Sequence, residues 1–184
     1  DYVKEKRRIF GWKKHEARSV AGITMGELNA IERIEATDEY FVKVLAVMLG
    51  LISPKGKGSK RIDWEGAGYD IAREKVLELQ FIRAYRYFIE IQNELKGVAK
   101  AWKKLEMPLT PQEANAQVQR KNRGMSTICL GYCQLVGGAI QPSDVWHLRW
   151  STVYLAYEAE RDKNMAQRKL AQMNKPKPSK SRRR

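Results

Sequence analysis

Apolar residues recur three and four positions apart over most of the chain, and glycine, proline or polar residues interrupt them at intervals. This spacing is typical of helices that bury one face. The first such segment runs from about Thr24 to Leu51, and Thr24 with Glu27 three residues later forms the pattern of a capping box at a helix start. The stretch Ala-Thr-Asp-Glu at 36–39 interrupts it, so we expect two short helices there rather than one.

The second of these helices has signals at both ends. Thr37 or Asp38 is expected to cap its start. Gly50 and then Ser53-Pro54 are expected to end it, because glycine favours the C-terminal cap and proline cannot continue a helix. A loop from Pro54 to about Gly68 follows. Its Lys-Gly-Lys-Gly-Ser-Lys run lacks the spacing of a phosphate-binding loop and no strand pattern precedes it, so we expect no nucleotide site.

The longest predicted helix runs from about Tyr69 or Asp70 to Leu105. Its apolar residues step by four and three alternately, which is the spacing of a seam that packs against partner helices. An aromatic stripe at this spacing indicates packing rather than a cofactor or base-stacking site. The seam residues that we predict on this helix are Phe81, Tyr85, Phe88, Leu95 and Trp102.

Two further helices are expected towards the C-terminus. A segment that restarts at Thr110-Pro111 turns apolar only after Gly124. The last helix is expected to start at Pro142 with Ser143 as a cap. Beyond Tyr157 its pattern turns charged, so we expect it to project from the body. Its predicted seam residues are Trp146, Trp150 and Tyr157.

Together these segments predict a mainly α-helical bundle with one long central helix, a projecting C-terminal helix and basic, flexible termini. We expect a basic N-terminal arm over residues 1–20, a helical domain over 21–173 with a basic loop at 54–68, and a basic C-terminal tail over 174–184. A chain of 184 residues of which 43% are hydrophobic can bury a core of this kind. No apolar run approaches the ~18 residues of a membrane span, so we expect no membrane partner.

The net charge of +14 is concentrated outside the expected helices. Residues 1–18 carry seven basic and three acidic side chains, and residues 174–184 carry six basic side chains and no acid. Four more bases stand in the glycine-rich loop. Basic arms release counterions from phosphates without a folded groove, so we expect contact with nucleic acid or an acidic partner rather than a purely solubilising role. The residues expected to make this contact are Lys175, Lys177, Lys180, Arg182, Arg183, Arg184, Lys55, Lys57, Lys60 and Arg61.

The side chains that most metal sites need are sparse. His15 and His147 are the only histidines, and Cys129 and Cys133 stand four apart without further ligands near them. We expect buried free thiols, no metal site and no cofactor. Two cysteines without a secretory leader also indicate a reducing compartment, so we expect a protein that is not secreted.

Three acidic residues near the loop are the one alternative to the absence of a metal or catalytic site. Asp63, Glu65 and Asp70 could bind a metal or act as acid and base, but acid clusters at helix starts favour capping and dipole compensation. Neither a serine nucleophile elbow nor a dinucleotide fingerprint is present. We therefore predict no catalytic residue, and an enzyme is the third of three hypotheses.

Two stretches resemble a known class of protein. The run Ile-Thr-Met-Gly-Glu-Leu-Asn-Ala-Ile-Glu at 23–32, followed by 38–50, resembles the opening of small helical proteins of tailed bacteriophages. Gly-Gly-Ala-Ile at 137–140 and then 143–154 are similar to the C-terminal part of such proteins, and together the stretches touch about a third of the chain. The resemblance implies a structural or tail-assembly role in a virion, with no catalytic residues.

The first stretch also resembles phage-repressor-type helix-turn-helix domains. In those domains a second helix and a turn separate the corresponding motifs. Only seven residues lie between Ile23 and Ile31 here, which leaves no room for a recognition helix.

The leading hypothesis is a non-catalytic structural subunit or assembly factor of a large complex in the neck or tail region of a tailed-phage virion. Its partners are other subunits, or copies of itself in a ring, and its basic ends contact neighbours or nucleic acid. The alternative is an RNA-contacting scaffold subunit of a ribonucleoprotein such as an organellar ribosome. The two hypotheses share their composition, so the sequence leaves both open.

Overall fold

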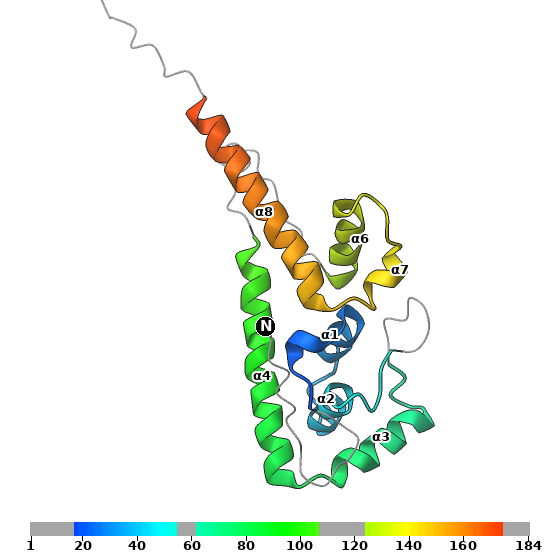
Figure 1. Cartoon of the computed structure of the whole chain (residues 1–184). Helices are drawn as coiled ribbons and strands as arrows, with labels where there is room; N and C mark the ends of the chain where they lie inside the picture. The colour runs from blue at the N-terminus through cyan, green and yellow to red at the C-terminus, as the bar shows by residue number, and fades with distance from the viewer. Residues whose placement is uncertain (1–16, 55–61, 107–123, 175–184) are drawn as a thin grey trace, which may run out of the picture.

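A computed structural model describes residues 17–54, 62–106 and 124–174, and within these ranges the chain is helical and forms no strand (Figure 1). This confirms the predicted mainly α-helical bundle. The elements are the 3-10 turn η1 (Val20–Gly22), α1 (Met25–Glu32), α2 (Tyr40–Met48), α3 (Ala67–Leu77), α4 (Phe81–Lys104), α6 (Met125–Leu135), α7 (Pro142–Val145) and α8 (Trp150–Met173).

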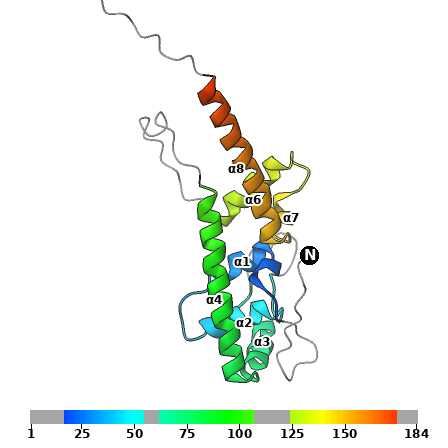
Figure 2. The ribbon, with the colours of Figure 1, turned by 60° about the vertical axis from the view of Figure 1, so that its left-hand side comes forward.

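The helices form a body with one long helix along its side and another leaving its top. In Figures 1 and 2, α4 runs the length of the body, α3 crosses at its foot, and α1 and α2 lie between them. Helices α6 and α7 flank the first half of α8, whose second half rises clear of them. The predicted projection of the C-terminal helix is therefore present.

The centre of the core is α2, which is surrounded by α1, α3 and α4. Six of its nine residues are buried, so it lacks a solvent face. The large apolar cluster around it draws side chains from every helix between α1 and α4. A second, smaller cluster joins the start of α1 to α6, α7 and the base of α8. Trp102, Met125 and Trp150 touch both clusters and so tie them into one body.

The start of α1 is as predicted, whereas the start of α2 is not. Thr24 and Glu27 form the full capping box. Helix α2 begins at Tyr40 with Glu39 before it, and neither Thr37 nor Asp38 caps it. The carboxylate of Glu39 instead accepts hydrogen bonds from α3, so this turn is shaped by a tertiary contact that the local sequence does not show.

The predicted single helix from residue 69 to 105 is wrong, because the chain breaks between Leu77 and Phe81. Gln80 takes an extended ψ of 113°, and Leu79 turns into the core, where it is only 9% exposed. The break lets α3 and α4 both pack on α2, which a straight helix could not do. No glycine or proline marks the break, so the sequence carries no local signal for it.

The predicted last helix is also divided. Its first turn, at Pro142, belongs to the separate α7, and α8 begins only at Trp150. The backbone between them bonds to the start of α1: the Met25 N–H donates to the Leu148 carbonyl at 2.8 Å and the Gly26 N–H donates to the Trp146 carbonyl at 2.9 Å. These carbonyls are therefore used between elements instead of within a continuous helix.

The contact that holds α3 to the start of α2 is sensitive to pH. Hydrogen bonds to Glu39 from the Tyr69 hydroxyl and from Arg73, the latter at 2.8 Å, hold the pKa of this carboxyl below its usual value of 4.5. A carboxyl whose pKa is lower in the folded than in the unfolded state stabilises the fold above the unfolded pKa. That contribution is lost as the pH falls through the folded value.

We expect Glu39→Gln to lower the free energy of unfolding at pH 7 by about 1 kcal/mol, since the pair is partly exposed. The difference from wild type should shrink as the pH falls below 4.5, because the wild-type carboxyl then also becomes neutral. Urea unfolding at pH 7 and pH 3 measures both values. Glu35→Gln, at an exposed acid in the same loop, serves as the control and should change stability little at either pH. A penalty for Glu39→Gln that is the same at both pH values would contradict this account.

Candidate interaction surfaces

A buried ion pair lies where the N-terminal segment, α1 and α2 meet. The Arg18 guanidinium contacts Glu27 Oε1 at 2.9 Å and donates to the carbonyl oxygens of Met48, at 3.1 Å, and Val47. Glu27 is only 5% exposed. Arg18 thus neutralises a buried carboxylate and donates to two carbonyls at the end of α2, of which that of Val47 also accepts from the Gly50 N–H.

The segment that carries Arg18 is fixed to α4 and α8 as well. The Tyr87 hydroxyl donates to the Arg18 carbonyl at 2.8 Å, and Glu94 accepts from the Val20 N–H at 2.6 Å. The Trp150 indole N–H donates to the Val20 carbonyl at 2.6 Å. Residues 18–20, at the end of the predicted N-terminal arm, therefore contact the helical body.

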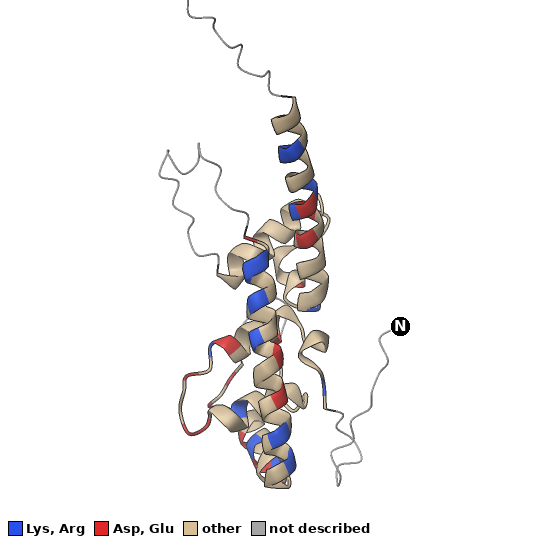
Figure 3. Cartoon of the chain, turned by 90° about the vertical axis from the view of Figure 1, so that its left-hand side faces the viewer, with Lys and Arg blue, Asp and Glu red and all other residues tan. Residues whose placement is uncertain are grey.

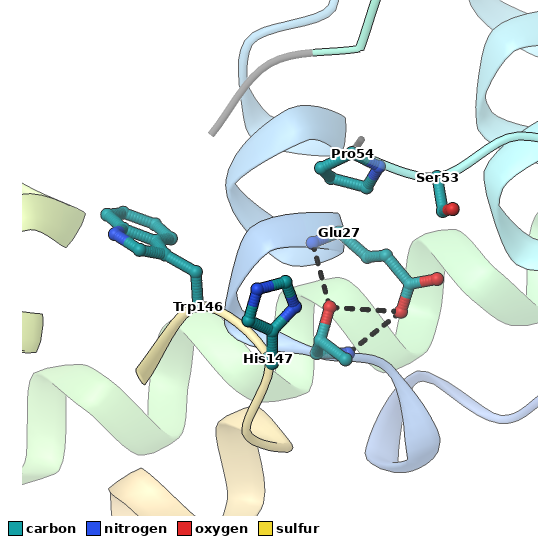
Figure 4. Close-up of a pocket in the computed structure, with 6 residues that line it drawn as sticks. Glu27, Ser53, Pro54, Trp146 and His147 are labelled. Atoms are coloured by element: carbon teal, nitrogen blue, oxygen red, sulfur yellow. Dashed lines mark hydrogen bonds between the residues drawn. The ribbon is translucent and has the colours of Figure 1, made fainter. Parts of the chain in front are cut away.

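A pocket of about 240 Å³ opens beside this junction (Figure 4). Its lining residues are Thr24, Glu27, Ser53, Pro54, Trp146 and His147. The Thr24 hydroxyl accepts from the Glu27 N–H at 3.2 Å, and Glu27 Oε2 accepts from the Thr24 N–H at 2.9 Å. His147 stands at the pocket and not in the core. The Glu27 carboxylate at this pocket takes part in both the capping box and the Arg18 ion pair.

We expect Arg18→Met to lower the free energy of unfolding by about 2–3 kcal/mol, because it leaves the Glu27 carboxylate buried without its cation. Adding Glu27→Gln should recover part of that loss, which a double-mutant cycle by urea denaturation measures. Arg86→Met, at an exposed arginine on α4, is the matched control and should change stability little. Equal losses for Arg18→Met and Arg86→Met would show that the ion pair is not structural.

A second hollow of about 300 Å³ lies between α1 and α4. It is lined by Leu28, Ile31, Glu32, Ile34, Tyr40, Gln92, Leu95, Lys96, Val98 and Ala99. Most of these residues are apolar, and burial raises the pKa of the Glu32 carboxyl at its edge. The Gln92 amide donates to the Tyr40 hydroxyl at 3.2 Å across the floor. The hollow is thus an apolar groove with a carboxylate on one wall and Lys96 on the other.

The predicted aromatic seam of α4 divides between the core and the surface. Phe88, Leu95 and Trp102 pack against the large apolar cluster. Phe81 and Tyr85 are 68% and 48% exposed, and their rings stack on each other with centroids 5.8 Å apart. The residues that α4 buries fully are Ala84, Ile91 and Val98, a heptad-spaced line beside the predicted seam. Phe88, Leu95 and Trp102 therefore lie beside the buried line, whereas Phe81 and Tyr85 lie at the surface.

The seam on the last helix lies at the second apolar cluster. Trp146 is buried in the turn after α7, and Trp150 and Tyr157 pack from α8. The ring of Trp102 meets Tyr157 edge-on at 6.0 Å, so α4 and α8 touch through aromatic side chains. The Tyr157 hydroxyl donates to the Ile128 carbonyl of α6 at 2.7 Å. These contacts anchor the base of α8.

We expect Gly131→Ala in α6 to destabilise the protein by about 1–3 kcal/mol, because the added methyl would overlap the Tyr157 hydroxyl. Combining it with Tyr157→Phe removes the overlap and should recover part of the loss. Gly97→Ala in α4 has open space around it and should stabilise by about 0.5–1 kcal/mol, as alanine favours a helix over glycine. Thermal unfolding of the three variants tests this, and a harmless Gly131→Ala would contradict it.

The basic residues singled out from the sequence lie outside the described ranges. These are Lys55, Lys57, Lys60 and Arg61 in the loop and Lys175, Lys177, Lys180, Arg182, Arg183 and Arg184 in the tail. The described basic residues that sequence reasoning did not single out include Lys96, Lys100, Lys103 and Lys104 of α4, and Figure 3 shows basic residues along the upper part of this helix. Their spacing of three and four on one helix was the signal that could have found them.

The cysteines and the acidic residues near the loop also lie in the described part of the chain. Cys129 and Cys133 are buried free thiols, as predicted. Asp63 accepts from the Glu65 N–H at 3.1 Å and shapes the turn before α3. Among the described residues no group of three or more His, Cys, Asp or Glu is placed to hold a metal ion. No described helix combines the length and apolar character needed to cross a membrane.

Comparisons with protein-family models, with curated proteins and with solved structures gave no match for this chain.

Proposed function

We propose that this chain is a non-catalytic structural subunit or assembly factor of a large complex, and that the complex is the neck or tail region of a tailed-phage virion. The observation that carries the proposal is that two long helices present apolar side chains which the body leaves uncovered. Helix α4 buries three of its 24 residues and α8 buries one of 24. Long helices with so little buried surface are stabilised by further packing partners.

The exposed apolar residues gather on these helices. Eleven large apolar side chains of the described residues are exposed, and seven of them are on α4 and α8. Those seven are Phe81, Ile82, Tyr85, Ile89, Leu155, Leu170 and Met173. Single exposed apolar residues need no explanation, but rows of them along a helix favour protein contacts. The assignment of those contacts to a phage particle is supported by the resemblance of 23–32 and 143–154 to tailed-phage proteins.

The projecting part of α8 suits a subunit that reaches a neighbour. Its last 11 residues, Lys163–Met173, extend about 16 Å at 1.5 Å per residue. Leu170 and Met173 are 54% and 72% exposed there. In this proposal the chain acts by binding, and it works within a virion or the host cytoplasm.

Light scattering of the full chain at low and high salt, with and without nucleic acid, tests the proposal. A defined oligomer, or a complex with another virion protein, whose mass does not depend on nucleic acid is the expected result. Leu170→Ser with Met173→Ser should weaken that assembly, and Ile71→Ser, which is 55% exposed on α3, is the control.

The ribonucleoprotein alternative predicts a different outcome. A monomer that binds RNA only when residues 175–184 are present, with affinity falling steeply with salt, would overturn the virion proposal in its favour.

A further inference from the structure

The solvent-facing side of α4 carries one continuous line of residues with two different halves. The line begins with Ile82, Tyr85 and Ile89, which are 61%, 48% and 41% exposed. Their spacing of three and four places them on one face, since a helix turns about 100° per residue. The stacked ring of Phe81 lies beside them. This first half is an apolar patch at the foot of the molecule.

The same line continues into lysines. Lys96, Lys100 and Lys103 follow at spacings of four and three and are exposed. Within the described residues, no carboxylate forms an ion pair with any of them. From Ile82 to Lys103 the line is about 32 Å long at 1.5 Å per residue. We call this line the α4 face, and it is apolar in its first half and basic in its second.

The apolar groove between α1 and α4 opens next to the middle of the α4 face. Lys96 belongs to both, and Gln92 and Ala99 form the wall between them. With a volume of about 300 Å³, the groove has room for a large apolar side chain. A partner bound to the α4 face could therefore insert one apolar side chain into the groove between α1 and α4.

Two copies of this chain do not fit together through their α4 faces. A parallel pair of α4 helices would place lysines against lysines, which repel. An antiparallel pair would place the three lysines against the apolar patch and remove their charges from water without a partner. The occupant must instead bring apolar side chains to the first half and carboxylates to the second.

We propose that the α4 face docks an amphipathic helix of a different protein, with apolar residues at one end and Asp or Glu at the other, both at spacings of three and four. Ile82, Tyr85 and Ile89 provide the i, i+3, i+7 contacts of a helix-on-helix interface. Lys96, Lys100 and Lys103 fix the direction of the bound helix through its carboxylates. This inference extends the proposed function. It rests on the proposed function for one point, which is that the partner is a component of the same assembly.

Binding of a designed peptide to the full chain by fluorescence anisotropy tests the α4 face. The probe is a labelled helical peptide of 24 residues, the length of α4, with leucines in one half and glutamates in the other. Two matched peptides replace the glutamates by lysines or the leucines by serines. We expect the leucine–glutamate peptide to bind at least about tenfold more tightly than either.

Variants of the chain show how much each half of the α4 face contributes to peptide binding. Ile82→Ser with Ile89→Ser should weaken binding about tenfold, and Lys96→Ala with Lys100→Ala should weaken it and flatten its salt dependence. The matched control is Ile71→Ser with Leu130→Ser, at residues 55% and 53% exposed elsewhere. Circular dichroism of each variant verifies that it is folded, which the exposure of the substituted residues favours.

Three outcomes would overturn the inference. The first is equal peptide binding by the α4 variants and the control. The second is displacement of the peptide by a single-stranded RNA of about 20 nucleotides that needs only the lysines, which would make the face a nucleic-acid site. The third is loss of a homodimer in the Ile82→Ser and Ile89→Ser variant, which would make the occupant a second copy. If the peptide binds as expected but the chain joins no large complex, the α4 face stands and the proposed function fails.

Discussion

The buried carboxylate of Glu27 is the group around which the rest of the molecule is arranged. It completes the capping box that starts α1, and it holds Arg18, whose guanidinium also bonds the last carbonyls of α2. Two residues after Arg18, the Val20 carbonyl accepts a hydrogen bond from the Trp150 indole N–H at the base of α8. A charge that is 5% exposed tolerates no rearrangement that removes its partner, so the N-terminal segment, α1, α2 and α8 share one fixed geometry.

Local signals in the sequence were sufficient where the cause of a structure is local. Thr24 with Glu27, Gly50 and the apolar spacing around the two helices that follow Ile23 predicted α1 and the end of α2. They failed where a contact distant in sequence decides the backbone. The break before Phe81 follows from packing of two helices on α2, and the late start of α8 follows from bonds to Met25 and Gly26. Neither contact leaves a glycine or proline at the break as a marker.

The candidate surfaces also include features that the sequence predicted and features that only the packing of the helices decides. The sequence showed that α4 carries an aromatic stripe, but a stripe that is apolar on two adjacent faces does not reveal which face the core takes. Ala84, Ile91 and Val98 take it, and Phe88, Leu95 and Trp102 beside them pack against the large apolar cluster. Phe81, Ile82, Tyr85 and Ile89 are left exposed. Isoleucines and aromatic residues lie on both sides of α4, so the packing of α4 on α2, and not the size of a side chain, decides which residues are buried.

The anchoring of α8 has a mechanical consequence. The helix is clamped along its first half, where the Trp150 N–H donates to the Ile23 carbonyl at 3.2 Å, Tyr157 bonds to α6 and Arg161 donates to the Lys104 carbonyl at 3.0 Å. The residues from 162 to 173 extend about 18 Å at 1.5 Å per residue, so a tilt of about 10° at the clamp moves the tip by about 3 Å. The N-terminal segment around Val20 is one side of that clamp. The contacts that fix the N-terminal segment therefore also set the direction in which the C-terminal tip points, at the opposite end of the sequence.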